Sequence, residues 1–305
     1  KMQTRREWLN SSLGIGGLLL GPTSILSAQE KTDFNPRRLE PIIRLSSNEN
    51  PYGPSKLVQQ RIKNSFIHGC RYPYAYSDDL ASMLAKKHRV APESIIVTGG
   101  STEGLKISGL TFASNGGEII SGQPTFLAMM DYAKHWGATV NWVPVGKDKG
   151  YDLDEIEKRV SSNTKLIFLC NPNNPTGKIL SKEEMNAVVS IAQKFDAWLL
   201  ADEVYSGAER HNVDATQSFF GLYEKVIIVN GLSKAYGLPG LRIGWVVAPE
   251  NIINELWKRH EYTTVSSSML GNRLANLALR PDVKRALIAR TRDLVDSGFE
   301  TLQTY

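Results

Sequence analysis

The chain has 305 residues, of which 41% are hydrophobic and 22% are charged. This balance is typical of a soluble globular protein with one large core or two unequal domains, and it excludes collagen, low-complexity disorder and a polytopic membrane protein. The formal net charge is +5 without a dense basic block, so the charge does not indicate a nucleic-acid partner. Two cysteines, Cys70 and Cys170, are too few for a disulfide framework or a cysteine-based zinc site.

The first 28 residues resemble a twin-arginine export signal. Arg5 and Arg6 precede an uncharged, Gly-rich and moderately apolar stretch, Ser11–Leu26, and small residues follow up to Ala28. The stretch is too short for a good membrane-spanning helix, and it contains Pro22. We therefore predict export to the periplasm, or otherwise out of the cytoplasm; the alternative is an ordinary N-terminal helix with two surface arginines.

Beyond Arg38, short apolar runs alternate with longer amphipathic segments. The runs predict seven strands, at residues 94–98, 118–121, 139–143, 165–170, 197–201, 225–230 and 242–248. The segments between them predict helices at residues 79–89, 102–113, 126–136, 154–160 and 182–195. This alternation predicts an α/β fold, a mostly parallel seven-stranded sheet sandwiched by helices. Continuous apolar runs at 166–169 and 226–229 fit strands that are covered on both faces.

The C-terminal part has a different pattern. From Glu250 the sequence is helical to the end of the chain, apart from an interruption at Pro281. We divide the chain into a signal peptide (1–28), an N-terminal arm (29–60), a large domain (61–262) and the start of a smaller C-terminal domain (263–305).

Ligands of parallel sheets bind beyond the carboxyl ends of the strands, so the residues after each strand are the first candidates for a site. Thr98–Gly104 is a Gly-rich turn that enters a helix, where free backbone N–H groups and the helix dipole favour an anion. By itself it is equally a plain strand-to-helix turn. Phe126 follows the next strand and could lie flat on a planar ligand, although a core phenylalanine is the commoner case.

Three further junctions carry polar side chains. Residues 170–177 read Cys-Asn-Pro-Asn-Asn-Pro-Thr-Gly, and the prolines fix an irregular loop whose asparagine amides are free to face a ligand. Asp202 ends an apolar strand, with Tyr205 three residues later; a buried carboxylate needs a positive partner, unless it is a helix cap or lies on a solvated rim. Lys234 follows another strand, with Arg242 eight residues later. Most lysines are surface charges, but a desolvated one has a lowered pKa and attacks carbonyl groups.

Together these motifs resemble those of a known family. Asn174-Pro175-Thr176-Gly177, Asp202 with Tyr205, and Ser233-Lys234 with Arg242 resemble the signature of fold-type I pyridoxal-phosphate aminotransferases of class I/II. Asn-Glu-Asn-Pro-Tyr-Gly-Pro at 48–54 and Arg-Tyr-Pro at 71–73 make the chain most similar to the histidinol-phosphate aminotransferase branch. The match covers roughly residues 42–280 in consistent order.

The resemblance implies a role for each matching residue. Lys234 would form a Schiff base with pyridoxal 5′-phosphate and move the proton between the substrate α-carbon and the cofactor. Asp202 would pair with the pyridine nitrogen, Asn174 and Tyr205 would hydrogen-bond the 3′-oxygen, and Phe126 would stack on the ring. The phosphate would be held by Gly100, Ser101, Thr102, Ser233, Arg242 and, from the neighbouring subunit of a homodimer, Tyr72. Lys234, Asp202 and Tyr205 are the predicted catalytic residues.

The chain departs from the family pattern at two points. Gly231 stands where the family usually has Ser or Thr, so one phosphate hydroxyl is absent and we expect a somewhat lower affinity for the cofactor. The arginine that binds the substrate carboxylate lies in the family's C-terminal small domain, which we expect to follow residue 305 in a longer protein.

The predicted function is transfer of an amino group from an amino acid, such as a histidinol-phosphate-like donor, to a 2-oxo acid. The alternatives are a decarboxylase of a phosphorylated amino acid, a cofactor-binding protein without turnover and, least favoured, a structural protein associated with export. The five histidines have no ligand spacing, so we expect no metal.

Overall fold

A computed structural model describes residues 46–113, 116–211, 213 and 216–304 of the protein. The predicted signal peptide and the predicted arm as far as residue 45 lie outside these residues. From Ser46 onward the chain forms one compact unit. The predicted boundaries at residues 60 and 262 stay predictions.

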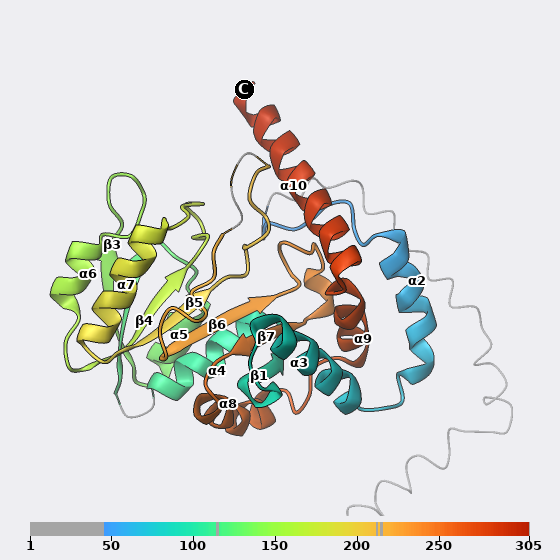
Figure 1. Ribbon diagram of the computed structural model, residues 1–305, viewed down its shortest axis with the longest axis horizontal. Helices are drawn as coiled ribbons and strands as arrows, with labels where there is room; N and C mark the ends of the chain where they lie inside the picture. The colour runs from blue at the N-terminus through green and yellow to red at the C-terminus, as the bar shows by residue number, and fades with distance from the viewer. Residues whose placement is uncertain (1–45, 114–115, 212, 214–215, 305) are drawn as a thin grey trace, which may run out of the picture. The chain divides into compact units, whose positions relative to one another are not determined.

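A seven-stranded sheet lies at the centre of the unit (Figure 1). Its strands, in the order β1-β7-β6-β5-β4-β2-β3, pair in parallel except at β7, which is antiparallel to both β1 and β6. The strands are β1 (Ile95–Thr98), β2 (Glu118–Gln123), β3 (Thr139–Pro144), β4 (Thr164–Cys170), β5 (Trp198–Asp202), β6 (Val226–Gly231) and β7 (Gly244–Val247). All seven predicted strands are confirmed, with ends shifted by no more than two residues.

Helices cover both faces of the sheet. One face carries α2 (Lys56–Ser65), α3 (Tyr74–His88), α6 (Leu153–Arg159), α7 (Lys182–Lys194), α9 (Met269–Ala278) and α10 (Pro281–Gln303). The other face carries α4 (Ser101–Ala113), α5 (Ala128–His135) and α8 (Glu250–Thr263). The predicted helix-covered α/β fold is therefore confirmed. Sequence analysis placed the start of α3 too late, at Asp79; the helix begins at Tyr74, directly after Pro73.

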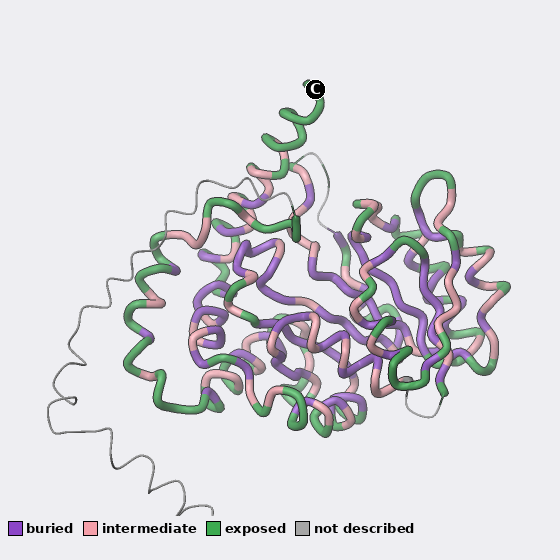
Figure 2. Tube along the Cα trace, turned by 180° about the vertical axis from the view of Figure 1, so that it is seen from behind, coloured by how far each residue is buried: buried purple, intermediate pink, exposed green. Residues whose placement is uncertain are grey.

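The core is divided by the sheet into two layers because successive strand residues point to opposite faces. In β4, Ile167 and Leu169 join one apolar cluster, while Leu166 and Phe168 join the other. Figure 2 shows the buried strands enclosed by helices that are exposed on their outer sides. The continuous apolar runs of the sequence thus correspond to strands that are buried on both faces.

The C-terminal helices follow the predicted pattern. Pro281 is the first residue of α10, where its missing N–H costs no hydrogen bond, so it separates α9 from α10. The last residues of α10 are exposed and extend away from the sheet (Figures 1 and 2). None of the helices in the described part of the chain is both long and apolar enough to cross a membrane.

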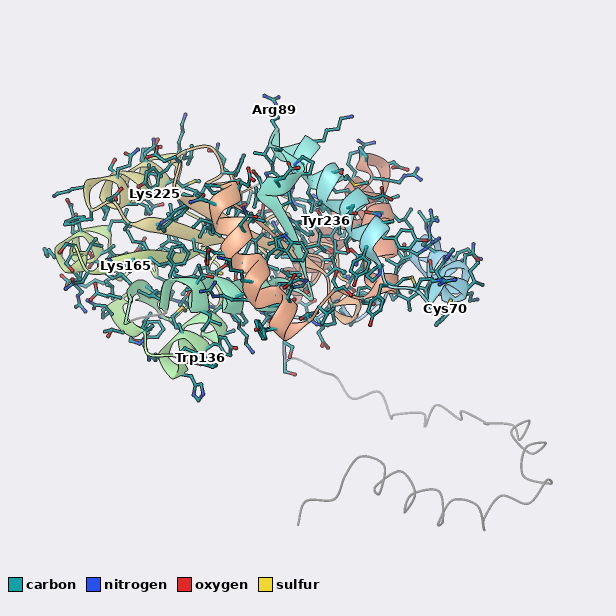
Figure 3. The ribbon with its side chains drawn as sticks, turned by 90° about the horizontal axis from the view of Figure 1, so that it is seen from below. Cys70, Arg89, Trp136, Lys165, Lys225 and Tyr236 are labelled. Carbon is teal, nitrogen blue, oxygen red and sulfur yellow. The ribbon has the colours of Figure 1, made fainter. Side chains whose placement is uncertain are left out.

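The two cysteines are far from forming a disulfide. Cys70 is exposed beyond the end of α2, and Cys170 is buried at the end of β4. Figure 3 shows Cys70 at the rim of the molecule, Arg89 and Trp136 pointing outward, and Tyr236 among the interior side chains.

Candidate functional site

A cavity of about 290 Å³ lies at the carboxyl ends of the parallel strands. Its lining includes nine of the predicted site residues: Ser101, Thr102, Phe126, Asn174, Asp202, Tyr205, Ser233, Lys234 and Arg242. They come from the segments after β1, β2, β4, β5 and β6, which are distant in the sequence. Parallel strands that end at one edge bring these segments together, as the strand-end argument predicts.

One end of the cavity is suited to an anion. Ser101 and Thr102 begin α4, whose first backbone N–H groups have no partner within the helix. Arg242 lies beside them and donates from Nη1 to the Pro239 carbonyl at 3.0 Å and from Nη2 to the Gly99 carbonyl at 3.4 Å. A fixed guanidinium next to a helix N-terminus is a site for a phosphate or a carboxylate.

Arg242 does not belong to a strand, in contrast to the prediction that a strand begins there. Residues Pro239–Leu241 form a 3₁₀ turn, and Arg242 has a left-handed backbone with φ of 52°. This conformation interrupts the extended backbone, so β7 begins only at Gly244. The turn directs the Arg242 side chain back toward Gly99.

The cavity also holds a buried acid. Asp202, the last residue of β5, is only 1% exposed, and its Oδ1 accepts a hydrogen bond from the Val204 amide at 3.2 Å. Burial raises the pKa of Asp202 to about 7, although the Val204 hydrogen bond and the charge of Lys234 act in the opposite direction. No ion pair to Asp202 occurs among residues 46–304 as far as they are described. The carboxylate is therefore placed to pair with a cationic group of a ligand.

Lys234 lines the same cavity and is half-buried in the loop after β6. Its Nζ donates to the Ser47 carbonyl at 2.6 Å and to the Asn48 carbonyl at 3.4 Å, and it stands 5.7 Å from the centre of the Tyr205 ring. Burial, assisted by the positive charge of Arg242, lowers the pKa of the Lys234 amine, while Glu49 and Asp202 raise it. A lowered pKa increases the neutral, nucleophilic fraction of the amine.

Asn174 and Tyr205 line the cavity wall near Asp202. The hydroxyl of Tyr205 accepts a hydrogen bond from Nδ2 of Asn48 at 2.8 Å, and burial raises its pKa. The neighbouring Asn173 is turned inward and donates to the Pro124 carbonyl at 3.2 Å and to Oγ1 of Thr176 at 3.0 Å. Because Asn173 fixes the loop, Asn174 is left to face the cavity.

Gly100 and Tyr72 do not line the cavity. Gly100 has φ of +100° and contacts the Arg242 guanidinium, so it borders the anion end from outside. Tyr72 is 71% exposed, and its ring stacks on that of Tyr74 with 5.6 Å between the centres. The predicted role of Tyr72 in a neighbouring subunit stays a prediction.

Sequence reasoning missed several residues of the wall: Ser47, Glu49, Cys170, Val204 and Pro239 line the cavity as well. Asn48 and Glu49 were part of a recognised motif, but the motif gave no sign that their segment crosses over Lys234. Tyr151 was also missed; its hydroxyl accepts from the Cys170 amide at 2.8 Å and donates to the Cys170 carbonyl at 3.0 Å at the end of β4. Within the described ranges, His, Cys, Asp and Glu form no group of three that could hold a metal.

The chain matches one protein family over most of its length. The model of aminotransferase class I and II matches residues 40–297. The chain is 34% identical over 223 residues to histidinol-phosphate aminotransferase 2 of Oceanobacillus iheyensis, covering 72% of this chain. It is 33% identical over 253 residues to an aromatic amino acid aminotransferase of Rhodococcus jostii, covering 83% of this chain and 69% of that protein.

A solved structure of an aminotransferase has a similar fold. A PLP-dependent aminotransferase from Streptococcus suis superposes with a TM-score of 0.71 at 28% identity, covering 81% of this chain and 66% of that one. The chain spans 61% of the length of the Oceanobacillus relative.

Proposed function

Because the chain belongs to aminotransferase class I and II, we propose that it binds pyridoxal 5′-phosphate in the strand-end cavity and transfers amino groups between an amino acid and a 2-oxo acid. The observation that carries the proposal is the presence of three groups in one cavity: an anion end at Arg242, a buried acid at Asp202 and an amine at Lys234.

The residues present fit this cofactor, which is the one that the family implies. It carries a phosphate, a basic pyridine nitrogen and an aldehyde. The N-terminus of α4 with Arg242 suits the phosphate, and the buried Asp202 needs the cation that a protonated pyridine supplies. Phe126 and Tyr205 add aromatic surface to the same cavity.

When bound, the pyridine ring accepts the electron pair that is left on the substrate α-carbon. The roles of the chain's own residues follow from their positions. Lys234 would bond the cofactor through Nζ and then carry the proton taken from the substrate α-carbon. Asp202 would stay ionised and keep the ring nitrogen beside it protonated. Asn174 and Tyr205 would orient the ring by hydrogen bonds.

The test is a pair of half-reactions in the full chain. We expect an amino donor to convert the bound cofactor to pyridoxamine phosphate, and a 2-oxo acid to reverse this. A Lys234→Ala variant should lose at least about 10³-fold in rate. Release of carbon dioxide instead would favour the decarboxylase, and a cofactor trapped on Lys234 by borohydride without turnover would favour a binding protein.

For the donor we propose a phosphorylated amino compound of the histidinol-phosphate kind. Its support is the resemblance at residues 48–54 and 71–73 and the name of the Oceanobacillus relative. An aromatic amino acid is the competing donor, because the Rhodococcus relative carries that name at nearly the same identity. Comparing kcat/KM for histidinol phosphate and phenylalanine separates the two, and a preference for phenylalanine would overturn our choice.

We also propose that the protein is a homodimer in which Tyr72 serves the neighbouring site. Residues 66–74 carry four exposed apolar or aromatic side chains, Phe66, Ile67, Tyr72 and Tyr74, a cluster typical of an interface. Mixed dimers of Lys234→Ala and Tyr72→Ala chains should regain activity, since one site in each then has both wild-type residues. Mixed samples no more active than either variant alone would contradict the shared site.

Finally, we propose export by the twin-arginine route, based on Arg5, Arg6 and the uncharged stretch that follows. This route carries folded proteins, so the cofactor could be bound before transport. Fractionation of expressing cells should find the protein outside the cytoplasm, and an Arg5→Lys, Arg6→Lys variant should stay inside. Equal location of both forms would contradict the proposal.

A further inference from the structure

A largely buried carboxylate, Glu103, lies in the first turn of α4 and is linked to Arg242 through Gly99. Its side chain is 10% exposed, and it is not part of the cavity lining. Oε1 accepts hydrogen bonds from Nδ1 of His260 at 2.9 Å and from the hydroxyls of Thr263 and Thr264, each at 2.6 Å. These three donors all come from the end of α8 or the residue after it.

The second oxygen of Glu103 points the other way, to the turn before α4. Oε2 accepts a hydrogen bond from the Gly99 amide at 2.5 Å. Four hydrogen bonds therefore meet on one carboxylate. Burial alone would raise the pKa of Glu103, but the bonds from His260, the two threonines and Gly99 lower it to about 2. The side chain is an anion at every pH at which the protein is expected to work.

Gly99 is consequently held through both of its backbone polar groups. Its N–H is bound by Glu103, and its carbonyl accepts from Nη2 of Arg242 at 3.4 Å. The next carbonyl, of Gly100, accepts from Oγ1 of Thr98 at 3.0 Å and from the Glu103 amide at 3.1 Å. This turn leads directly into Ser101 and Thr102, which line the cavity at the start of α4. The start of α4 and the Arg242 guanidinium thus both adjoin a turn that Glu103 holds.

We propose that Glu103 is a positioning residue for the phosphate group of the cofactor, an inference that rests on the proposed function. It does not reach the ligand, because it lies outside the cavity. By holding the Gly99 amide it keeps the Gly99–Thr102 backbone and Arg242 in the arrangement that binds the phosphate. The hydrogen bonds from α8 hold the carboxylate itself, because donors on both oxygens prevent it from rotating.

The test separates phosphate binding from general stability by using two ligands. Pyridoxal 5′-phosphate and pyridoxal differ only in the phosphate, so the ratio of their affinities measures the phosphate site. The full chain is purified with its cofactor, freed of it, and titrated with each ligand by absorbance. We expect Glu103→Ala to weaken pyridoxal 5′-phosphate by about tenfold or more and pyridoxal by less than about twofold.

Two further variants keep the inference falsifiable if Glu103→Ala folds poorly. Glu103→Gln should keep most of the wild-type ratio of the two affinities. Its amide oxygen can accept a hydrogen bond from Gly99, while its NH₂ group donates to the threonine hydroxyls. Thr263→Val is the matched control: it removes one bond to Oε1 but leaves the Gly99 bond, so the ratio should not change.

Equal weakening of both ligands by Glu103→Ala would show that Glu103 only stabilises the fold, and would overturn the inference. A Glu103→Gln protein that binds pyridoxal 5′-phosphate about tenfold more weakly, with pyridoxal unaffected, would also overturn it, because the glutamine still offers an acceptor to the Gly99 amide. The proposed function fails in a different way, namely if the unaltered protein binds neither ligand.

Discussion

The guanidinium of Arg242 lies directly against the α-carbon of Gly100. A β-carbon at Gly100 would stand 2.3 Å from Nη2 of Arg242, and Gly100 has φ of +100°, a conformation that other residues rarely adopt. Glycine at this position is therefore what allows the arginine to approach the N-terminus of α4. The anion end depends on this contact.

We expect Gly100→Ala to displace Arg242 and to weaken binding of pyridoxal 5′-phosphate by about tenfold or more, since a charge-assisted pair is worth roughly 1.5–3 kcal/mol. Equilibrium titration of the cofactor-free protein measures the effect. Gly240→Ala is the control, because Gly240 lies in the adjacent turn with no atom within 4 Å of the added carbon. Wild-type affinity in Gly100→Ala would contradict this account of the anion end.

A second prediction concerns Asp202 in the cofactor-free protein. Burial raises its pKa from 3.8 to about 7, so the folded state prefers the protonated acid. Its stabilising contribution is present below pH 3.8 and is lost as pH rises toward 7. We expect the free energy of unfolding to fall over this range, and Asp202→Asn to be more stable than the wild type at pH 8, by about 1 kcal/mol or more.

Bound cofactor should reverse the sign of that effect, because a protonated ring nitrogen then pairs with the carboxylate. Urea unfolding of both proteins at pH 5 and pH 8, with and without cofactor, provides the comparison. Glu203, whose pKa burial also raises to about 7, remains in the variant, so part of the pH dependence should persist. An Asp202→Asn protein that is less stable without cofactor at pH 8 would be inconsistent with the buried, unpaired acid.

A third prediction concerns the charge around Lys234. Glu49 raises the pKa of the Lys234 amine, against the larger effect of burial. Glu49→Gln removes a negative charge, so the ammonium form is less favoured and the pKa falls further. We expect the pH profile for reaction of the amine with pyridoxal to shift to lower pH. Glu224→Gln, at the opposite end of β6, should leave the profile unchanged, and an upward shift in Glu49→Gln would be the contrary result.

Much of the site could be predicted because parallel topology determines where strand ends meet. Apolar runs identified β4, β5 and β6, and polar residues at or shortly after the ends of these strands, such as Asn174, Asp202 and Lys234, line one cavity. The parallel arrangement of the strands was enough to predict that these residues line the cavity. The two-faced burial of the runs was predictable for the same reason, since helices cover both sides.

The remaining features depend on packing between distant segments. Lys234 donates a hydrogen bond to the carbonyl of Ser47, which lies 187 residues earlier in the chain. Nothing in the sequence around either residue indicates that contact. Arg242 looked like the first residue of a strand because apolar residues follow it, yet its left-handed backbone removes it from β7. The hydrogen bonds of Glu103 likewise join α4 to α8, which pattern analysis treats as independent helices.

The last prediction concerns Gly231, where the motif comparison and the packing lead to different expectations. The missing hydroxyl at this position suggests that Gly231→Ser would strengthen cofactor binding. However, a β-carbon at Gly231 would lie 2.9 Å from the Ile243 carbonyl oxygen and 3.3 Å from the α-carbon of Gly244, both rigid backbone atoms. Gly244 in turn packs on the Ser101 amide, where its own β-carbon would stand 2.3 Å away.

The two glycines therefore let the start of α4 pack closely on β6 and β7. We expect Gly231→Ser to lower the free energy of unfolding by about 1–3 kcal/mol and not to raise the affinity for pyridoxal 5′-phosphate. Denaturant unfolding and cofactor titration measure the two quantities, with Gly240→Ser as the same substitution in open space. A gain in affinity without loss of stability would mean that the serine fits, and that close packing is not the reason for glycine here.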